Sequence, residues 1–113
     1  MAEKSPRRLM LEASLSEDPN DPFRRYGLAL QCLREGDVEE GRQRLHSLIA
    51  DDPDGQVAAY QQLGQSYAET GDYQSAQAIL QAGVAKARSA GNGHAAEEME
   101  HLIASLDGLD TEN

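Results

Sequence analysis

The sequence of 113 residues has no tryptophan, one phenylalanine and four tyrosines, so aromatic rings can supply little of its core. A core built mainly from alanine and leucine suits closely packed helices better than stacked sheets. The single Cys32 excludes an internal disulfide and is compatible with a reducing compartment. No stretch approaches the roughly 18 apolar residues of a membrane span. Because Glu12 interrupts the short apolar run after Arg8, a secretory signal is not expected either, and we predict a cytoplasmic protein.

Basic residues are scarce in the second part of the chain. The formal net charge is −10, and residues 45–113 hold two of the ten basic residues but eleven of the twenty acidic ones. A negative surface repels phosphate groups, so nucleic acids and membrane surfaces are not expected as partners. The simpler explanation of this charge is solubility or adaptation to salt. The alternative is electrostatic attraction of a basic partner.

A repeat of about 35 residues runs through the chain. Shifting the sequence by 35 superposes Gly36-Asp37 on Gly71-Asp72. In each pair the glycine can adopt the left-handed conformation that ends a helix, and the aspartate can cap the next helix. A period of this length is typical of an array of helical hairpins, none of which buries its apolar face alone.

The spacing of apolar residues predicts six helices, with Pro19 and Pro53 each marking the end of one. Their expected ranges are 5–17, 21–35, 38–51, 56–70, 73–90 and 94–107. The polar residues that follow, 108–113, are expected to form a frayed tail. At this length the chain is predicted to be one all-α domain.

The second repeat, VAAYQQLGQSYAETGDYQSAQAILQAGV, resembles the tetratricopeptide repeat (TPR) consensus. The residues that match it in order are Tyr60, Leu63-Gly64, Tyr67, Gly71-Asp72-Tyr73, Ala76 and Leu80. The first repeat departs more, with Arg25 where an aromatic residue is usual and Gly41 where alanine is usual. The resemblance covers about residues 9–107. The segment DPFRRY at 21–26 is similar to the opening of short bacterial members of this family.

The resemblance implies antiparallel helical hairpins stacked as a right-handed superhelix, with two full repeats and a flanking helix at each end. The expected parts of this single domain, 1–113, are a cap helix 5–17, repeats 22–55 and 56–90, a capping helix 94–107 and the frayed tail 108–113. Such arrays are protein-interaction modules. We therefore expect an adaptor or scaffold that is not an enzyme and needs no cofactor.

The resemblance also implies a concave groove, lined by exposed residues of the first helix of each repeat. The expected partner-binding residues are Phe23, Tyr26, Leu30, Leu33, Arg34, Gln61, Gln65 and Ala68. This groove would be apolar at one end and rich in amides at the other, with Phe23 and Tyr26 as anchors for a peptide or protein segment. The alternative is that helix 5–17 or a second copy of the chain covers the stripe, because apolar stripes seldom stay open to water.

Other kinds of site find little support. The groove lacks the lysine and asparagine cluster with which TPR cochaperones bind a C-terminal carboxylate. His94, Glu98 and His101 share one helix face, but a structural zinc site needs a fourth ligand, so no metal is expected. No nucleophile–base pair or glycine-rich phosphate loop is recognisable. We expect a protein-interaction module whose partner the sequence does not identify. The alternative is a homodimeric, acidic, chaperone-like protein that shields an apolar client segment.

Overall fold

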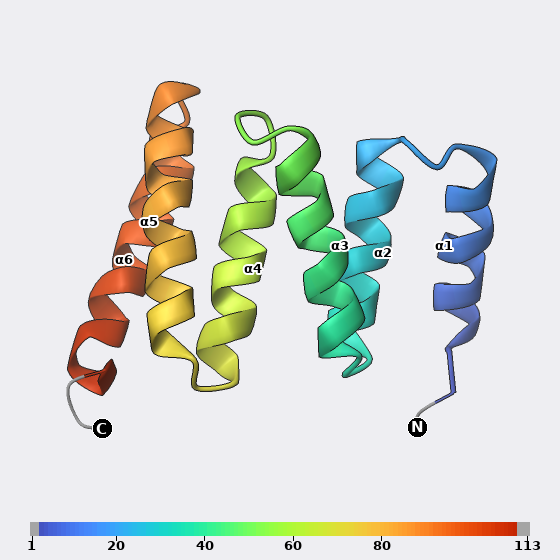
Figure 1. The fold of residues 1–113 in the computed structure, drawn as a ribbon, viewed down its shortest axis with the longest axis horizontal. Helices are drawn as coiled ribbons and strands as arrows, with labels where there is room; N and C mark the ends of the chain where they lie inside the picture. Colours follow the sequence, from blue (N-terminus) through green and yellow to red (C-terminus); the bar gives the residue numbers. More distant parts are fainter. Residues whose placement is uncertain (1–2, 111–113) are drawn as a thin grey trace.

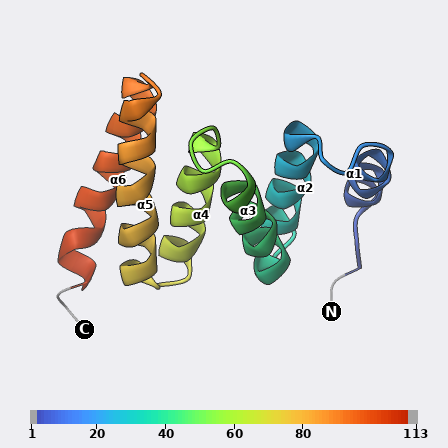
Figure 2. The ribbon, with the colours of Figure 1, turned by 45° about the horizontal axis from the view of Figure 1, so that its top comes forward.

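The computed structural model describes residues 3–110, which form six α-helices and no β-strand. The helices are α1 (Pro6–Glu17), α2 (Pro22–Arg34), α3 (Val38–Asp51), α4 (Val57–Glu69), α5 (Tyr73–Ser89) and α6 (Gly93–Asp110). They follow one another in chain order along a row, with the two ends of the chain at opposite ends of it (Figure 1), and a turned view shows the same order (Figure 2). None of these helices is long and apolar enough to cross a membrane. The predicted all-α helical array is confirmed.

The ends of the first five helices lie within one residue of the predicted ones. The exception is the C-terminal helix: the predicted frayed tail 108–113 begins too early, because α6 continues to Asp110. Packing against α5 anchors the helix just before this extension. Leu106 is buried in the core, and Gln77 of α5 donates a hydrogen bond to Asp107 (3.1 Å). Residues 111–113 lie outside the described range.

Hinges of one kind join α2 to α3, α4 to α5 and α5 to α6. Each contains a glycine in the left-handed region: Gly36 (φ 86°), Gly71 (φ 84°) and Gly91 (φ 75°). At the third hinge the Asn92 amide donates to the Ala87 carbonyl (2.8 Å), and the Asn92 side chain accepts from the Ala95 amide (3.1 Å). The two Gly-Asp hinges have equivalent bonds. The sequence predicted those two in detail, and the third only as a connection between helices.

The positive φ of one hinge leads to a stability prediction. Gly71→Ala is expected to lower the free energy of unfolding by about 1–2 kcal/mol, because a side chain is strained at this φ even though no atom lies within 4 Å of the added Cβ. Gly93→Ala is the matched control, since its surroundings are equally open and its φ is not in the left-handed region. That change should be neutral or stabilise by up to about 1 kcal/mol. Urea denaturation measures both, and equal losses would contradict the explanation.

The core consists of two clusters of buried side chains that meet at α4. The larger lies among α4, α5 and α6 and includes Tyr60 and Leu80. The smaller lies among α2, α3 and α4 and includes Leu45 and Leu63. Helices approach closely where small residues face a neighbour: a Cβ added to Gly64 would lie 2.5 Å from Cδ2 of Leu80. Because α4 contributes to both clusters, it holds the two hairpins together.

Long polar side chains link neighbouring helix pairs at three places in the array. The three residues are Arg8, Arg42 and Gln77, spaced by 34 and 35. Arg42 of α3 donates to the carbonyl oxygen of Ser66 in α4 (2.8 Å), and Gln77 of α5 donates to Asp107 in α6 (3.1 Å). Arg8 instead reaches the start of α3, so the spacing of these residues recurs while their partners differ.

Arg8 makes the first of these links and is buried, with 4% of its surface exposed. Its Nη2 donates to Asp37 (2.9 Å) and Glu40 (2.8 Å), while Nη1 lies 3.8 Å from Glu35 and Nε 3.5 Å from Glu12. Burial disfavours the charged guanidinium, but the hydrogen bond to Asp37 and the neighbouring negative charges outweigh it and raise the pKa of Arg8. Since Asp37 also caps α3, ion pairs hold α1 against the hinge between α2 and α3.

Candidate functional site

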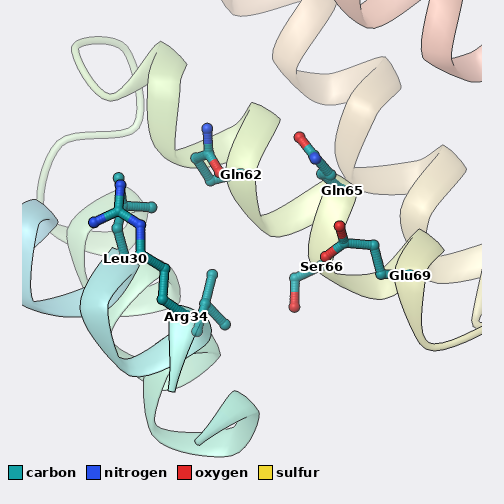
Figure 3. Close-up of a pocket in the computed structure, with 7 residues that line it drawn as sticks. Leu30, Arg34, Gln62, Gln65, Ser66 and Glu69 are labelled. Carbon is teal, nitrogen blue, oxygen red and sulfur yellow. The ribbon is translucent and has the colours of Figure 1, made fainter. Parts of the chain in front are cut away.

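An open cavity of about 350 Å³ lies between α2 and α4 (Figure 3). Its lining residues are Leu30, Leu33 and Arg34 from α2, and Gln62, Gln65, Ser66 and Glu69 from α4. The α2 wall is apolar with one cation, and the α4 wall is polar with one anion. Such a surface can bury apolar side chains on one side and form hydrogen bonds on the other.

The cavity contains four of the eight predicted partner-binding residues, namely Leu30, Leu33, Arg34 and Gln65. Gln62 and Ser66 were not predicted. Ser66 is buried, and its hydroxyl accepts a hydrogen bond from Nε of Arg42 (2.9 Å). This bond from α3 fixes the orientation of the Ser66 side chain.

Phe23 and Tyr26, the predicted anchors, lie beside the cavity. Phe23 begins the apolar side of α2 and is 87% exposed. Tyr26 is half-buried and packs against the smaller core cluster. Burial raises the pKa of Tyr26, although a hydrogen bond with Gln62 and the charge of Arg34 act in the opposite direction. Tyr26 therefore contacts the α4 wall directly, whereas Phe23 extends the apolar surface towards solvent.

The remaining two predicted residues, Gln61 and Ala68, face away from this cavity. Gln61 donates a hydrogen bond to Glu98 of α6 (3.2 Å), so it lies on the side of α4 that faces α6. Ala68 is half-buried and packs against the larger core cluster. Gln61 thus lies on the α6 side of α4, and Ala68 lies against the core.

Helix α1 does not cover the apolar stripe of α2. It packs on another side, where Leu11 lies 4.0 Å from a Cβ built on Gly27 and Arg24 donates to the carbonyl oxygen of Ser14 (2.7 Å). Phe23 remains exposed. Coverage of the stripe by the predicted helix 5–17 is therefore wrong, and coverage by a second copy stays a prediction.

The histidine and cysteine side chains outside the cavity form no reactive site among the described residues. Nε2 of His94 lies 2.7 Å from Glu98, but within residues 3–110 no three histidine, cysteine or acidic side chains converge where a metal could bind. Cys32 is fully buried, with Sγ 3.6 Å from a carboxylate oxygen of Glu40. Burial and the charge of Glu40 raise the pKa of this thiol, which favours its neutral form.

This stack of antiparallel helical hairpins, with an open cavity between the first helices of successive pairs, defines a helical-repeat protein. A family model described as tetratricopeptide repeat matches residues 33–99, which is more than half of the chain. The chain belongs to the tetratricopeptide repeat family, as the sequence predicted. Members of this family are generally non-catalytic modules for protein–protein interaction.

Relatives agree with this assignment. A TPR repeat-containing protein of Pseudomonas aeruginosa is 29% identical over 97 residues, which cover 86% of this chain and 91% of that protein. The solution structure of a tetratricopeptide repeat domain protein from Salinibacter ruber matches with a TM-score of 0.76 and 29% identity, over 81% of this chain and 92% of that one. A protein from Bordetella parapertussis shares the fold at 21% identity, with a TM-score of 0.82 over 98% of this chain and 95% of that one.

Proposed function

We propose that this chain is a cytoplasmic adaptor that holds an extended segment of a partner protein in the groove between α2 and α4. The cavity between these helices carries the proposal. Leu30 and Leu33 offer an apolar wall for the partner's side chains, while the amides of Gln62 and Gln65 can hydrogen-bond its main chain. Binding of this kind requires no covalent step and no cofactor.

In this proposal, the predicted residues outside the cavity extend its walls or support them. Phe23 extends the apolar wall beyond the cavity, and Tyr26 supports the wall through its contact with Gln62. Gln61 continues the polar wall towards α6, and Ala68 packs beneath it. The groove would therefore be held in shape before a partner arrives, which lowers the ordering cost of binding.

Leu30→Glu is expected to weaken partner binding at least about tenfold, because it places a carboxylate in the apolar wall where a partner side chain would be desolvated. Leu30 is only half-buried, so the helices should remain folded. The partner is first captured from native lysate with the tagged chain. Isothermal calorimetry with the identified segment then compares the variant and the wild type, and circular dichroism verifies helicity.

Leu9→Glu is the matched control, since Leu9 is 52% exposed on α1 and lies outside the cavity. The affinity of Leu9→Glu for the partner segment should equal that of the wild type. Equal weakening by both variants, or none by Leu30→Glu, would contradict groove binding. Loss of helicity in Leu30→Glu would instead assign Leu30 to the core. Sedimentation equilibrium tests the homodimeric alternative, because a dimer lost only in Leu30→Glu would assign the groove to a second copy.

A further inference from the structure

The chemistry of the groove changes from one end of the array to the other. The cavity lies between α2 and α4, and the groove would continue over α6, because α4 contacts both α2 and α6. These helices begin at residues 22, 57 and 93, so shifts of 35 and 36 relate equivalent positions. Two such sets are Tyr26, Gln61 and Glu97, and Leu30, Gln65 and His101. Each set passes from an apolar or aromatic residue on α2, through a neutral amide on α4, to a charged or titratable residue on α6.

A hydrogen bond places α6 beside the polar side of α4. Gln61 of α4 donates to Glu98 of α6 (3.2 Å), and Glu98 also lies 2.7 Å from Nε2 of His94. The Glu98 side chain is 48% exposed, and Glu97 beside it is exposed. The α6 end of the groove therefore presents two carboxylates to solvent next to the amides of α4.

The basic residues of this half of the chain do not neutralise that end. Lys86 is paired with Asp54 (2.7 Å) and Arg88 with Glu100 (2.7 Å), and both cations lie on α5. Among the ion pairs of residues 3–110, none joins Glu97 or Glu98 to a lysine or arginine. The excess negative charge is thus available to a partner at the α6 end. The α2 end carries the cation Arg34 and apolar side chains.

We infer that the groove holds an extended protein segment with apolar side chains over α2 and lysine or arginine side chains over α6. This inference rests on the groove-binding function proposed above and adds the chemistry and direction of the partner. Packed helices are about 10 Å apart, so α2 and α6 are separated by roughly 20 Å, the reach of about six extended residues. A phosphate-bearing partner is excluded from the α6 end, because the carboxylates would repel it.

Synthetic peptides test this inference directly. The probe carries leucines in one half and lysines in the other, with the two groups separated by about six serine and threonine residues. In two control peptides the lysines are replaced, by glutamines in one and by glutamates in the other. Titration of the isotopically labelled chain, followed by NMR, should give the highest affinity for the lysine peptide and the lowest for the glutamate peptide. The preference should weaken as salt is added.

Variants locate the source of the preference. The double variant E97Q/E98Q should lower affinity for the lysine peptide about three- to tenfold and remove most of its salt dependence. The double variant E17Q/E39Q removes the same charge from exposed positions on α1 and α3 and should change affinity less than about twofold. A spin label on the lysine end should broaden amide signals of α6, and a label on the leucine end those of α2. The reverse pattern, or equal effects of the two double variants, would overturn the inference.

Other outcomes separate this inference from the proposed function. If the three peptides bind equally and Leu30→Glu weakens each of them, groove binding stands and the charge preference is wrong. If the lysine peptide binds but Leu30→Glu leaves its affinity unchanged, or if none of the peptides shifts the groove amides, both proposals fail. If those amides shift with protein concentration alone, a second copy occupies the groove and the basic partner is overturned.

Discussion

Leu80→Ala is expected to reduce the free energy of unfolding by about 2–5 kcal/mol. Leu80 is fully buried in the larger core cluster, and its side chain fills the space beside Gly64. Gly64 has no side chain that could move into the vacated volume, so truncation leaves a cavity. Urea denaturation followed by circular dichroism measures the loss. Gln81→Ala on the exposed side of α5 is the control and should change stability by less than about 0.5 kcal/mol.

A second substitution identifies the contact responsible. Gly64→Ala alone should cost about 1–3 kcal/mol, because its Cβ would lie 2.5 Å from both Cγ and Cδ2 of Leu80. In the Leu80→Ala background the same methyl group enters the cavity. The double variant should therefore lose less stability than the two single losses added together, by at least about 0.5 kcal/mol. Additive losses would show that the two residues do not share this space.

Arg8→Met is the second change with a large expected effect, and should cost about 2–3 kcal/mol. The estimate lies between the values for surface and buried ion pairs, because Arg8 is buried while Asp37 and Glu40 remain partly exposed. Methionine keeps the apolar stem but leaves the surrounding carboxylates to repel one another. Amide hydrogen exchange should then accelerate in α1 well before it accelerates in α4 and α5.

Arg7→Met is the control for this prediction. Arg7 is exposed and lies next to Arg8 on the same helix, so its loss removes the same charge without disturbing the buried cluster. Its stability should remain within about 0.5 kcal/mol of the wild type. Equal losses from both variants, or unchanged exchange in α1 of Arg8→Met, would show that the ion pairs do not hold this helix.

The helix boundaries followed from the sequence because their causes are local. A glycine in the left-handed conformation and an aspartate cap act within a few residues, so Gly36-Asp37 and Gly71-Asp72 could be recognised without knowledge of the rest of the fold. The end of α6 was missed for the opposite reason. Its last turns are held by α5 through the side chain of Gln77, and no local pattern in 108–110 reports that contact.

Helical periodicity predicts which residues of one helix share a face, but not how that face is turned towards the neighbouring helices. Leu30, Leu33 and Gln65 do line the cavity, and their role in partner binding stays a prediction. Gln61 and Gln62 are neighbours, yet one faces α6 and the other α2. Successive residues differ by about 100° around a helix, and the rotation of α4 depends on its packing with both neighbours. Arg8 was missed for another reason, because its partners Asp37 and Glu40 lie 29 and 32 residues away along the chain.

The meeting of the two core clusters at α4 has a mechanical consequence. The hairpins α2–α3 and α4–α5 meet where α3 packs against α4, with Ile49 and Ile79 against both clusters, and we expect the stack to bend most easily at this junction. The cavity spans this joint on one side. A segment that binds both α2 and α4 would restrict bending between these helices and so fix the curvature of the array. Occupancy of the groove would thus fix the relative orientation of helices that the segment does not contact.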